Sequence, residues 1–429
     1  MKKVSQYNVF INRGNSIIVY NTLWNTFLIT NRHYAELLQK GCCNDFEYKN
    51  EKLFNAIVEK KMLIEDFVNE MKLIRDTLNK TNNPPGYFEL IVNPTLGCNF
   101  KCWYCYESHQ DASFIDNLGI QGIISFVQGV LSTQETKKFV LKFFGGEPLL
   151  AYRNVIKPIL SKVYELALRY RVDFSGGITT NGYLLSTERL SFLYDHQIRN
   201  LQITIDGNRD RHNGVRFITP GYGSYDKIVQ NIHNALSVGF IVSLRLNISK
   251  DTGLNVRELL KDFDDLEVTQ RDLLVFSVHK VWQEDLSVYD IVEEIVSEIR
   301  ASGYKCTNYF SFPSSIWNTC YADKPNHLII NPKGKVYKCT ACNFSEEYVE
   351  GILTSDGEIS WNSLHKKRLQ VSPLDIKACR ECPILPICIG GCSQQIIESK
   401  SPMECPKGMT LNETKKYAYR VLSEKLERL

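Results

Sequence analysis

Short apolar segments alternate with helical patterns through the middle of this chain. Six segments rich in β-branched and aromatic residues, each followed by a helical pattern, lie at 87–95, 138–145, 173–181, 200–207, 241–249 and 272–279. This alternation predicts parallel strands joined by right-handed crossovers, and a partial barrel is the simplest closure of such a sheet. We therefore expect an α/β fold built on a partial (β/α)6 barrel.

The amino-terminal part has a different order of elements. Three extended segments come first, at 5–11, 16–20 and 26–30, the first two forming a predicted hairpin. Three helical patterns follow, at 31–40, 51–65 and 66–79. The sequence TNNPPG at 81–86 then predicts a linker. We expect residues 1–80 to form a module of their own.

Three cysteines share one short loop after the first predicted barrel strand. Cys98, Cys102 and Cys105, called the loop cysteines below, are spaced C-x3-C-x2-C. Each cysteine of such a loop can take one iron of a [4Fe-4S] cluster, which leaves the fourth iron free for another ligand. His109, four residues after Cys105, leaves a zinc site open as the alternative.

The loop sequence CNFKCWYC resembles the cluster loop of radical S-adenosylmethionine (SAM) enzymes, and further segments resemble motifs of that family in order. GGEP at 145–148 resembles the glycine-rich SAM-binding segment, TNG at 180–182 the third-strand motif, and IDG at 205–207 the fourth-strand motif. HNGVR at 212–216, followed by GYGS at 221–224, is similar to the segment after the fourth strand in peptide-modifying members of the family. The resemblance covers residues 87–300.

The resemblance implies a set of SAM contacts. Glu147, with the two glycines before it, would hold the methionyl amino group, Arg216 the carboxylate, and Tyr104 would offer backbone contacts to adenine. The full expected set is Tyr104, Gly145, Gly146, Glu147, Asn181, Thr204, Asp206, Arg216 and Asn247. On the fifth strand Arg245 and Asn247 share one face, where they could bind SAM or each other.

Cysteines also gather near the carboxyl terminus, where eight of the fourteen follow residue 319. Seven of these have a spacing that resembles the SPASM domain, which carries two auxiliary [4Fe-4S] clusters in related enzymes. The resemblance assigns the first cluster to Cys320, Cys339 and Cys392, and the second to Cys379, Cys382, Cys388 and Cys405. A zinc ribbon and disulfides are the alternatives.

The first auxiliary cluster lacks an obvious fourth ligand. In sulfatase-maturing relatives that ligand lies six residues before the position of Cys320, where this chain has Ser314. Cys342 or Cys306 could replace it, or the iron could stay open to substrate.

A second departure concerns catalysis. Sulfatase maturases carry an aspartate as the proposed base directly after the position of Cys339, where this chain has Thr340. A threonine hydroxyl cannot deprotonate a substrate at neutral pH, which disfavours formylglycine formation. The catalytic residues stay unknown, with Tyr104, Tyr106 and Thr340 as weak candidates and Asp272 as a possible proton relay.

Charge and apolar content exclude other classes of function. The net charge is +3, which gives no strong attraction to nucleic acid or lipid. No segment reaches the roughly 18 apolar residues of a membrane helix. The amino terminus lacks the apolar region needed for export, so we expect a cytoplasmic protein without disulfides. The acidic segment at 262–267 reads as a solvated helix end.

Taken with the resemblance, these patterns predict five regions: a peptide-recognition-like domain at 1–80, a linker at 81–86, a radical SAM partial barrel at 87–303, a SPASM domain at 304–408 and a terminal helix at 409–429. The amino-terminal order resembles the winged-helix peptide-recognition element of peptide maturases. An exposed strand edge there could add a leader peptide as a further strand. The alternative is a domain that only supports the barrel.

The resemblance implies an enzyme that cleaves SAM to a 5′-deoxyadenosyl radical and abstracts hydrogen from a ribosomally synthesised peptide, forming a thioether or other crosslink. Its implied cofactors are three [4Fe-4S] clusters and SAM. Its implied partners are the precursor peptide and a reductant protein such as flavodoxin or ferredoxin, with neither nucleic acid nor membrane. A sulfatase maturase is the second hypothesis. A non-catalytic iron-sulfur or zinc protein that binds peptides is the third.

Overall fold

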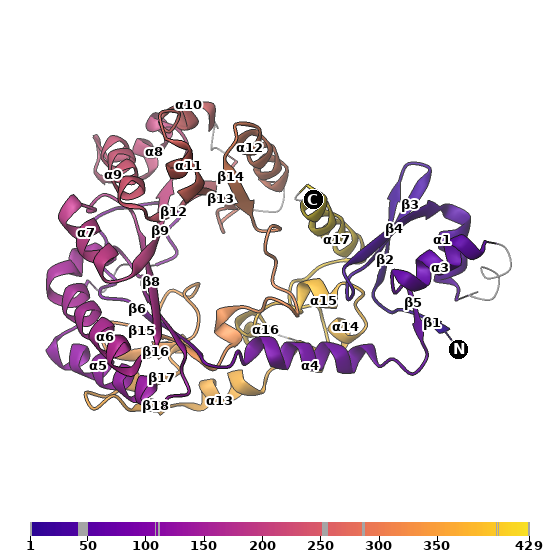
Figure 1. Ribbon diagram of the computed structural model, residues 1–429, viewed down its shortest axis with the longest axis horizontal. Coiled ribbons are helices and arrows are strands. Elements are labelled where there is room, and N and C mark those ends of the chain that lie inside the picture. The colour runs from indigo at the N-terminus through magenta and orange to yellow at the C-terminus, as the bar shows by residue number, and fades with distance from the viewer. Residues whose placement is uncertain are drawn as a thin grey trace. The chain divides into compact units, whose positions relative to one another are not determined.

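The computed structural model describes residues 2–41, 50–107, 109, 112–250, 256–284, 288–399, 401 and 403–427. It divides into two compact units (Figure 1). Unit 1 consists of Met1–Pro84, Phe310–Pro325 and Lys367–Leu429, and unit 2 of Pro85–Tyr309 and Asn326–Lys366. Cys42 and Cys43 lie outside the described residues. Among the described residues, no helix combines the length and the apolar character needed to cross a membrane.

Unit 2 is built on a sheet of strand order β14-β13-β12-β9-β8-β7-β6-β15-β16-β17-β18. The six strands predicted from the sequence are all present, as β6 (Tyr87–Val92), β7 (Lys138–Phe143), β8 (Asp173–Thr180), β9 (Ile198–Ile205), β12 (Ile241–Ile248) and β13 (Leu274–Lys280). Each pairs in parallel with its neighbour. The prediction of a parallel α/β sheet is confirmed.

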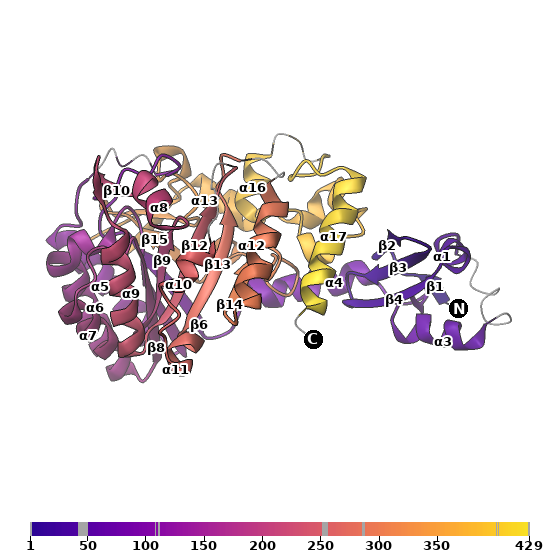
Figure 2. The same cartoon turned by 90° about the horizontal axis from the view of Figure 1, so that it is seen from above.

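Helices connect these strands and cover one face of the sheet (Figures 1 and 2). The main ones are α5 (Asn117–Ser132), α6 (Lys157–Tyr170), α7 (Thr187–Asp195), α9 (Tyr225–Val238) and α12 (Tyr289–Ala301). Shorter elements between strands are α8 (Arg209–Val215), β10 (Phe217–Thr219), β11 (Tyr222–Gly223), α10 (Val256–Lys261) and α11 (Val268–Leu273).

The two faces of the sheet differ in polarity, as β12 illustrates. Leu244 and Leu246 are fully buried in the core between sheet and helices, whereas Ser243, Arg245 and Asn247 alternate with them and stay partly exposed. Successive side chains of a strand point to opposite faces. The outer face therefore packs against helices, and the inner face is left to polar side chains.

The structure extends the sheet beyond the sequence prediction at both sides. The strand β14 (Lys305–Asn308) adds in parallel to β13, and β15 (His327–Ile330) adds in parallel to β6. Three antiparallel strands follow, β16 (Lys335–Tyr337), β17 (Gly351–Leu353) and β18 (Ile359–Trp361). These strands have three or four residues, too few for a period to stand out.

Unit 1 contains a three-stranded antiparallel sheet of order β2-β3-β4, with β2 (Asn8–Arg13), β3 (Ser16–Asn21) and β4 (Thr26–Asn31). The helices are α1 (Arg32–Gln39), α3 (Glu51–Glu59) and α4 (Glu70–Asn82). The expected helix at 51–65 is wrong in its last part. The chain turns at Lys61, which has a φ of +59°, and β5 (Leu63–Glu65) then pairs with β1 (Lys2–Val4).

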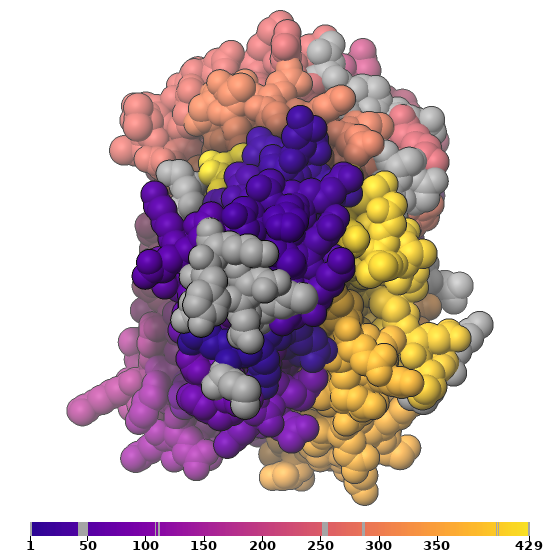
Figure 3. All heavy atoms as spheres, turned by 90° about the vertical axis from the view of Figure 1, so that its right-hand side faces the viewer, coloured from indigo at the N-terminus to yellow at the C-terminus, as the bar shows by residue number. Residues whose placement is uncertain are grey.

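Both ends of the chain contribute to one apolar core in unit 1. Tyr7, Leu23 and Ile74 pack in the same cluster as Ile376 and Leu385. Figure 3 shows the amino-terminal residues of this unit in indigo beside carboxy-terminal residues in yellow. The carboxy-terminal helices of this unit are α14 (Lys377–Arg380), α15 (Leu385–Cys388), α16 (Ser393–Glu398) and α17 (Leu411–Leu426), of which α17 lies against β2. The helix α13 (Ser363–Gln370) precedes them and includes the boundary between the two units at Lys367.

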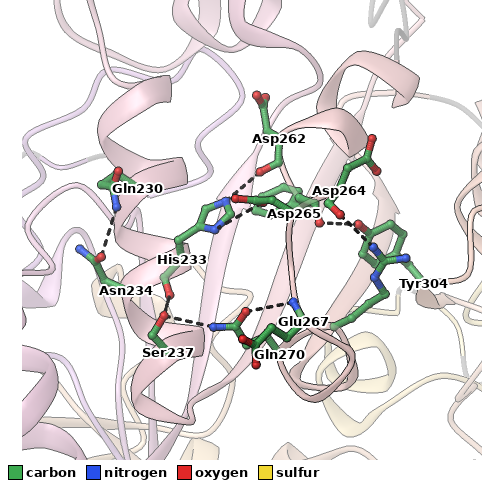
Figure 4. A network of polar contacts seen from close by, with 12 residues as sticks. Gln230, His233, Asn234, Ser237, Asp262, Asp264, Asp265, Glu267, Gln270 and Tyr304 are labelled. Atoms are coloured by element: carbon green, nitrogen blue, oxygen red, sulfur yellow. Dashed lines mark hydrogen bonds and ion pairs between the residues drawn. The ribbon is translucent and has the colours of Figure 1, made fainter.

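The acidic segment at 262–267 forms turns after α10 and is tied to α9 (Figure 4). His233 on α9 lies 2.7 Å from the Asp262 carbonyl oxygen and 4.0 Å from an Asp265 carboxylate oxygen. The Asp262 carboxylate accepts a hydrogen bond from Tyr225 at 2.5 Å. The expectation of a solvated segment holds for Asp264 and its exposed neighbours, but Asp262 is partly buried and holds the helix in place.

Candidate active site

The loop cysteines line a cavity of about 110 Å³ at the carboxyl ends of the barrel strands. Its wall consists of Cys98, Phe100, Cys102, Tyr104, Cys105, Glu107, His109, Gly146, Thr179, Thr180, Asn181, Thr204 and Arg216. Five residues of the expected SAM set are in this wall. The others, Gly145, Glu147, Asp206 and Asn247, are outside it. Sequence reasoning missed Phe100, Glu107 and Thr179 as wall residues, although Phe100 is inside the cluster-loop motif and the other two lie within two residues of a motif.

The loop cysteines provide the donor set of a cluster with one open iron. Burial raises the pKa of Cys98 to about 12 and also raises the pKa of Cys102 and Cys105. Buried thiols of this kind ionise when a bound cation compensates the charge, as metal ligation does. Three thiols on one loop therefore fit a [4Fe-4S] cluster.

His109, the alternative fourth ligand for zinc, does approach the loop. Its Nε2 lies 3.1 Å from Cys105 Sγ, and its Nδ1 lies 2.7 Å from the Leu96 carbonyl oxygen. A ring nitrogen beside one thiol is compatible with either type of centre. Among the described residues, no three His, Cys, Asp or Glu side chains converge as a site for a single metal ion.

Glu147 holds the wall of the cavity from behind. Its side chain is fully buried, and its carboxylate accepts hydrogen bonds from Asn181 N–H at 2.7 Å, the Thr180 hydroxyl at 2.8 Å and Leu149 N–H at 3.0 Å. Burial raises the pKa of Glu147, while these three donors act in the opposite direction. The carboxylate therefore links the end of β8 to the turn that follows β7.

The two glycines before Glu147 allow a very close approach of two loops. Gly145 and Gly146 have φ of +84° and +39°, and a Cβ on Gly146 would lie 2.1 Å from the Gly97 carbonyl oxygen. The amide of Gly146 donates to Glu107 at 2.9 Å. Only glycine fits between the cysteine loop and this turn.

Tyr104, Asp206 and Arg216 form a buried polar triad on one side of the cavity. The Tyr104 hydroxyl donates to Asp206 at 2.5 Å and accepts from Arg216 at 2.7 Å. Arg216 lies 4.0 Å from the Asp206 carboxylate. Burial raises the pKa of Asp206, and the charge of Arg216 opposes that shift. His212 is also buried and lies 3.0 Å from Ser224, whose hydroxyl donates to the Arg216 carbonyl.

The remaining candidates from the sequence are spread over the unit. Arg245 donates to Asn247 at 2.8 Å, so these two side chains do bind each other. Tyr106 stacks on Trp282 with ring centroids 4.7 Å apart. Asp272 is exposed, pairs with Lys305, and precedes β13, so it lies at the amino end of that strand, away from the cavity. A proton relay through Asp272 is therefore wrong.

In unit 1 the four cysteines expected to hold the second auxiliary cluster line one cavity of about 240 Å³. They are Cys379, Cys382, Cys388 and Cys405. A zinc ion held by four thiolates at about 2.3 Å would draw the sulfurs around a single atom. Four thiols around an open cavity suit the larger iron-sulfur cluster better. The cavity is closed on one side by Gly390, where a Cβ would lie 2.6 Å from Cys379 Sγ.

The cysteines expected at the first auxiliary cluster lie in both units. In unit 1, Cys320 donates a hydrogen bond to Cys392, which raises the pKa of Cys320 and lowers the pKa of Cys392 to about 7. In unit 2, the thiol of Cys342 donates to the carbonyl of Cys339 at 2.9 Å. Cys306 instead packs into the main core on β14. Of the two possible extra ligands, only Cys342 adjoins an expected ligand within its unit.

Comparison with known proteins gives a consistent result. Residues 92–266 match the model of the Radical SAM superfamily. Fe-coproporphyrin III synthase of Methanosarcina barkeri is 26% identical over 229 residues, which are 50% of this chain and 53% of that protein. Radical SAM cyclopropyl synthase TigE of Paramaledivibacter caminithermalis is 23% identical over 392 residues, which are 81% of this chain and 78% of that protein.

Solved structures show the same fold at low identity. Native anSMEcpe with bound AdoMet and Kp18Cys peptide has a TM-score of 0.61 and 17% identity, covering 80% of this chain and 100% of that one. Streptococcus suis SuiB bound to precursor peptide SuiA has a TM-score of 0.55 and 15% identity, covering 94% of this chain and 98% of that one. The partial-barrel fold predicted from the motifs is confirmed.

Proposed function

The chain belongs to the radical SAM superfamily, and we propose that it modifies a ribosomally synthesised peptide. Membership implies a [4Fe-4S] cluster and SAM as cofactors, which agrees with the donor set of the loop cysteines. The observation that carries the proposal is the convergence of these three thiols with Asn181 and Arg216 around one cavity at the strand ends.

The residues around this cavity divide into those that touch a ligand and those that position others. Asn181, Thr204 and Arg216 are in the wall, where they can bind the polar groups of SAM. Glu147 and Asp206 act from behind, since the first holds Asn181 and the second holds Tyr104. A cluster held by the three loop cysteines would supply the electron for the reductive cleavage of SAM to methionine and a 5′-deoxyadenosyl radical. The barrel places the substrate and keeps water away.

The auxiliary clusters belong to the proposal too. Four thiols around one cavity support a second auxiliary cluster in unit 1. For the first auxiliary cluster, the thiols of Cys320, Cys339 and Cys392 are the proposed ligands, and Cys342 is preferred over Cys306 as a fourth. These clusters would accept an electron from the substrate or bind a peptide thiolate.

A peptide substrate is supported by relatives and by unit 1. The two structural relatives described above are named as complexes with peptides. In the sheet β2-β3-β4, the central strand is β3, which pairs on both sides, so the segment at 16–20 is no pairing edge. Of the two edge strands, β2 lies against α17. This leaves β4 as the candidate edge for strand addition.

The sulfatase-maturase hypothesis has less support. The position after Cys339 is occupied by Thr340, which is partly exposed and has no acid-base function at neutral pH. The likeness to anSMEcpe is one of fold, at 17% identity.

The test uses anaerobically purified protein, SAM, dithionite and a panel of synthetic candidate precursor peptides. We expect release of 5′-deoxyadenosine together with a peptide that has lost two hydrogens, detected by mass spectrometry. Release of 5′-deoxyadenosine with no change in the peptide would contradict the peptide assignment.

A variant of the β4 edge tests the role of unit 1. Ile29 is 49% exposed, so Ile29→Asp should change stability by no more than about 0.5 kcal/mol. It should weaken peptide binding at least tenfold if the leader adds to β4. Ile241→Asp is the matched control, because Ile241 is 43% exposed at the amino end of β12 in unit 2. Equal binding by both variants would leave the sheet a structural role only.

A further inference from the structure

The inner face of the sheet carries a polar row on β9, β12 and β13. In the parallel register, Arg245 lies level with Thr204 on one side and with Ser277 on the other. One step further along, Asn247 lies level with His279. Residues that are level in a parallel sheet share a face. All except Thr204 keep part of their surface accessible, and Thr204 is also in the wall of the cavity of the loop cysteines.

Arg245 is the charged member of this row, and its charge is not matched by an acid. Its hydrogen bond goes to the neutral amide of Asn247. The nearby charges are Asp206 and Arg216, and Asp206 is already engaged by Tyr104 and lies 4.0 Å from Arg216. Burial and the charge of Arg245 lower the pKa of His279 to about 3, so that ring is neutral. Two guanidinium groups thus face one carboxylate.

An aromatic pair lies beside this guanidinium. Tyr106 of the cysteine loop lies near Arg245 and stacks on Trp282, whose side chain is 53% exposed. Trp282 follows the carboxyl end of β13, and its neighbour Gln283 donates to the Tyr104 carbonyl at 2.9 Å. The loop and the strand end are therefore linked, and they present an accessible flat surface next to a positive charge.

We propose that Arg245 binds a carboxylate of the substrate peptide, with Ser277 as a second donor and the Tyr106–Trp282 pair as the wall along which the peptide lies. This rests on the proposed peptide function. The carboxylate completes the charge balance that Asp206 leaves open. Arg216 is in the wall of the cysteine cavity, whereas Arg245, on β12, is not among the residues of that wall.

The experiment measures binding to the cluster-loaded protein with SAM by anaerobic equilibrium dialysis. Three labelled tripeptides are compared: blocked Gly-Glu-Gly, blocked Gly-Gln-Gly, and Gly-Gln-Gly with a free carboxyl terminus. Glutarate serves as a non-peptide dicarboxylate. The variants are Arg245→Gln and the conservative Arg245→Lys. The matched control is Arg199→Gln, because Arg199 is a partly buried arginine at the opposite end of β9, held by the Tyr194 carbonyl.

For the wild type and Arg199→Gln, we expect a carboxylate-bearing tripeptide to bind about 10- to 100-fold more tightly than the blocked Gly-Gln-Gly, as for a charge-assisted pair. The preferred tripeptide shows whether a side chain or the carboxyl terminus is bound. Arg245→Gln should reduce the preference to less than threefold, and Arg245→Lys should retain part of it. If Arg245→Gln folds poorly, Arg245→Lys still tests the subsite, because lysine keeps the positive charge.

Two outcomes separate this subsite from the proposed function. Binding of all tripeptides regardless of charge would overturn the subsite and leave the peptide function standing. Arg245-dependent binding of glutarate without any tripeptide binding would support the subsite and overturn the peptide function. The variants are also titrated with SAM. A loss of SAM affinity as large as the loss for the acidic tripeptide would assign Arg245 to SAM and overturn the inference.

Discussion

Replacement of Glu147 by Gln tests whether this residue acts by positioning the end of β8. The change keeps the size of the side chain but replaces one acceptor oxygen by a donor. In the cheaper orientation of the amide, its oxygen still faces Thr180 and Leu149, and its NH2 group faces the N–H of Asn181. A buried N–H without an acceptor costs about 1–3 kcal/mol.

Part of that cost is offset. Burial raises the pKa of Glu147, because removing the charged carboxylate from water is unfavourable. The neutral amide of glutamine does not carry this desolvation penalty. We therefore expect a net loss of about 1–2 kcal/mol. For a unit of this size the melting temperature should fall by about 2–8 °C. Hydrogen exchange at the Asn181 amide should become about 5- to 30-fold faster.

The assay combines anaerobic calorimetry with hydrogen exchange read by mass spectrometry. Glu165→Gln is the matched control, since Glu165 makes only exposed ion pairs with Lys162 and Arg169 on α6. Exposed pairs contribute little, and that variant should melt with the wild type. If the two variants melt together and exchange at Asn181 is unaltered, Glu147 does not position β8 and our reading of the site is wrong.

Three further predictions follow from the sites. Changing all three loop cysteines to Ala should abolish release of 5′-deoxyadenosine and retain the auxiliary iron; release at the wild-type rate under dithionite would refute the assignment. Cys382→Ala with Cys388→Ala should lower iron by about four atoms per chain, whereas loss of about one zinc would point to a ribbon. Burial would raise the pKa of Glu89, but His327 and Lys142 lower it to about 2. This interaction should raise the free energy of unfolding by about 3 kcal/mol above about pH 5, and the gain should be lost as the pH falls toward 2. Glu89→Gln should remove this pH dependence in acid-unfolding titrations.

The sequence predicted the barrel well because its strands are long and regularly followed by helices. The strand at 173–181, for example, is found at Asp173–Thr180. It predicted the amino-terminal region less well, because β5 has only three residues and gains its pairing from β1, some 60 positions away in the chain. Local patterns carry no information about such distant partners.

The same distinction applies to the site. Motifs with fixed spacing, such as the loop cysteines and GGEP, marked the right part of the fold. They did not indicate that Glu147 accepts hydrogen bonds from the Thr180 hydroxyl and the Asn181 amide, since these depend on how β8 ends. The pairing of Tyr104 with Asp206 joins residues 102 positions apart, and the stack of Tyr106 on Trp282 joins two loops that no motif connects.

The shared core of unit 1 has a consequence for how this chain reaches its native state. Tyr7 and Leu23 leave the ribosome first, yet their partners Ile376 and Leu385 are made only near the end. Contacts between such distant positions form slowly, because closing a long loop costs chain entropy before any contact has formed. Until then these amino-terminal side chains lack part of their native apolar contacts, and exposed apolar surface of this kind favours aggregation. The cysteines around Cys379 belong to the same late step, so metallocluster assembly and completion of this core would occur together in the cell.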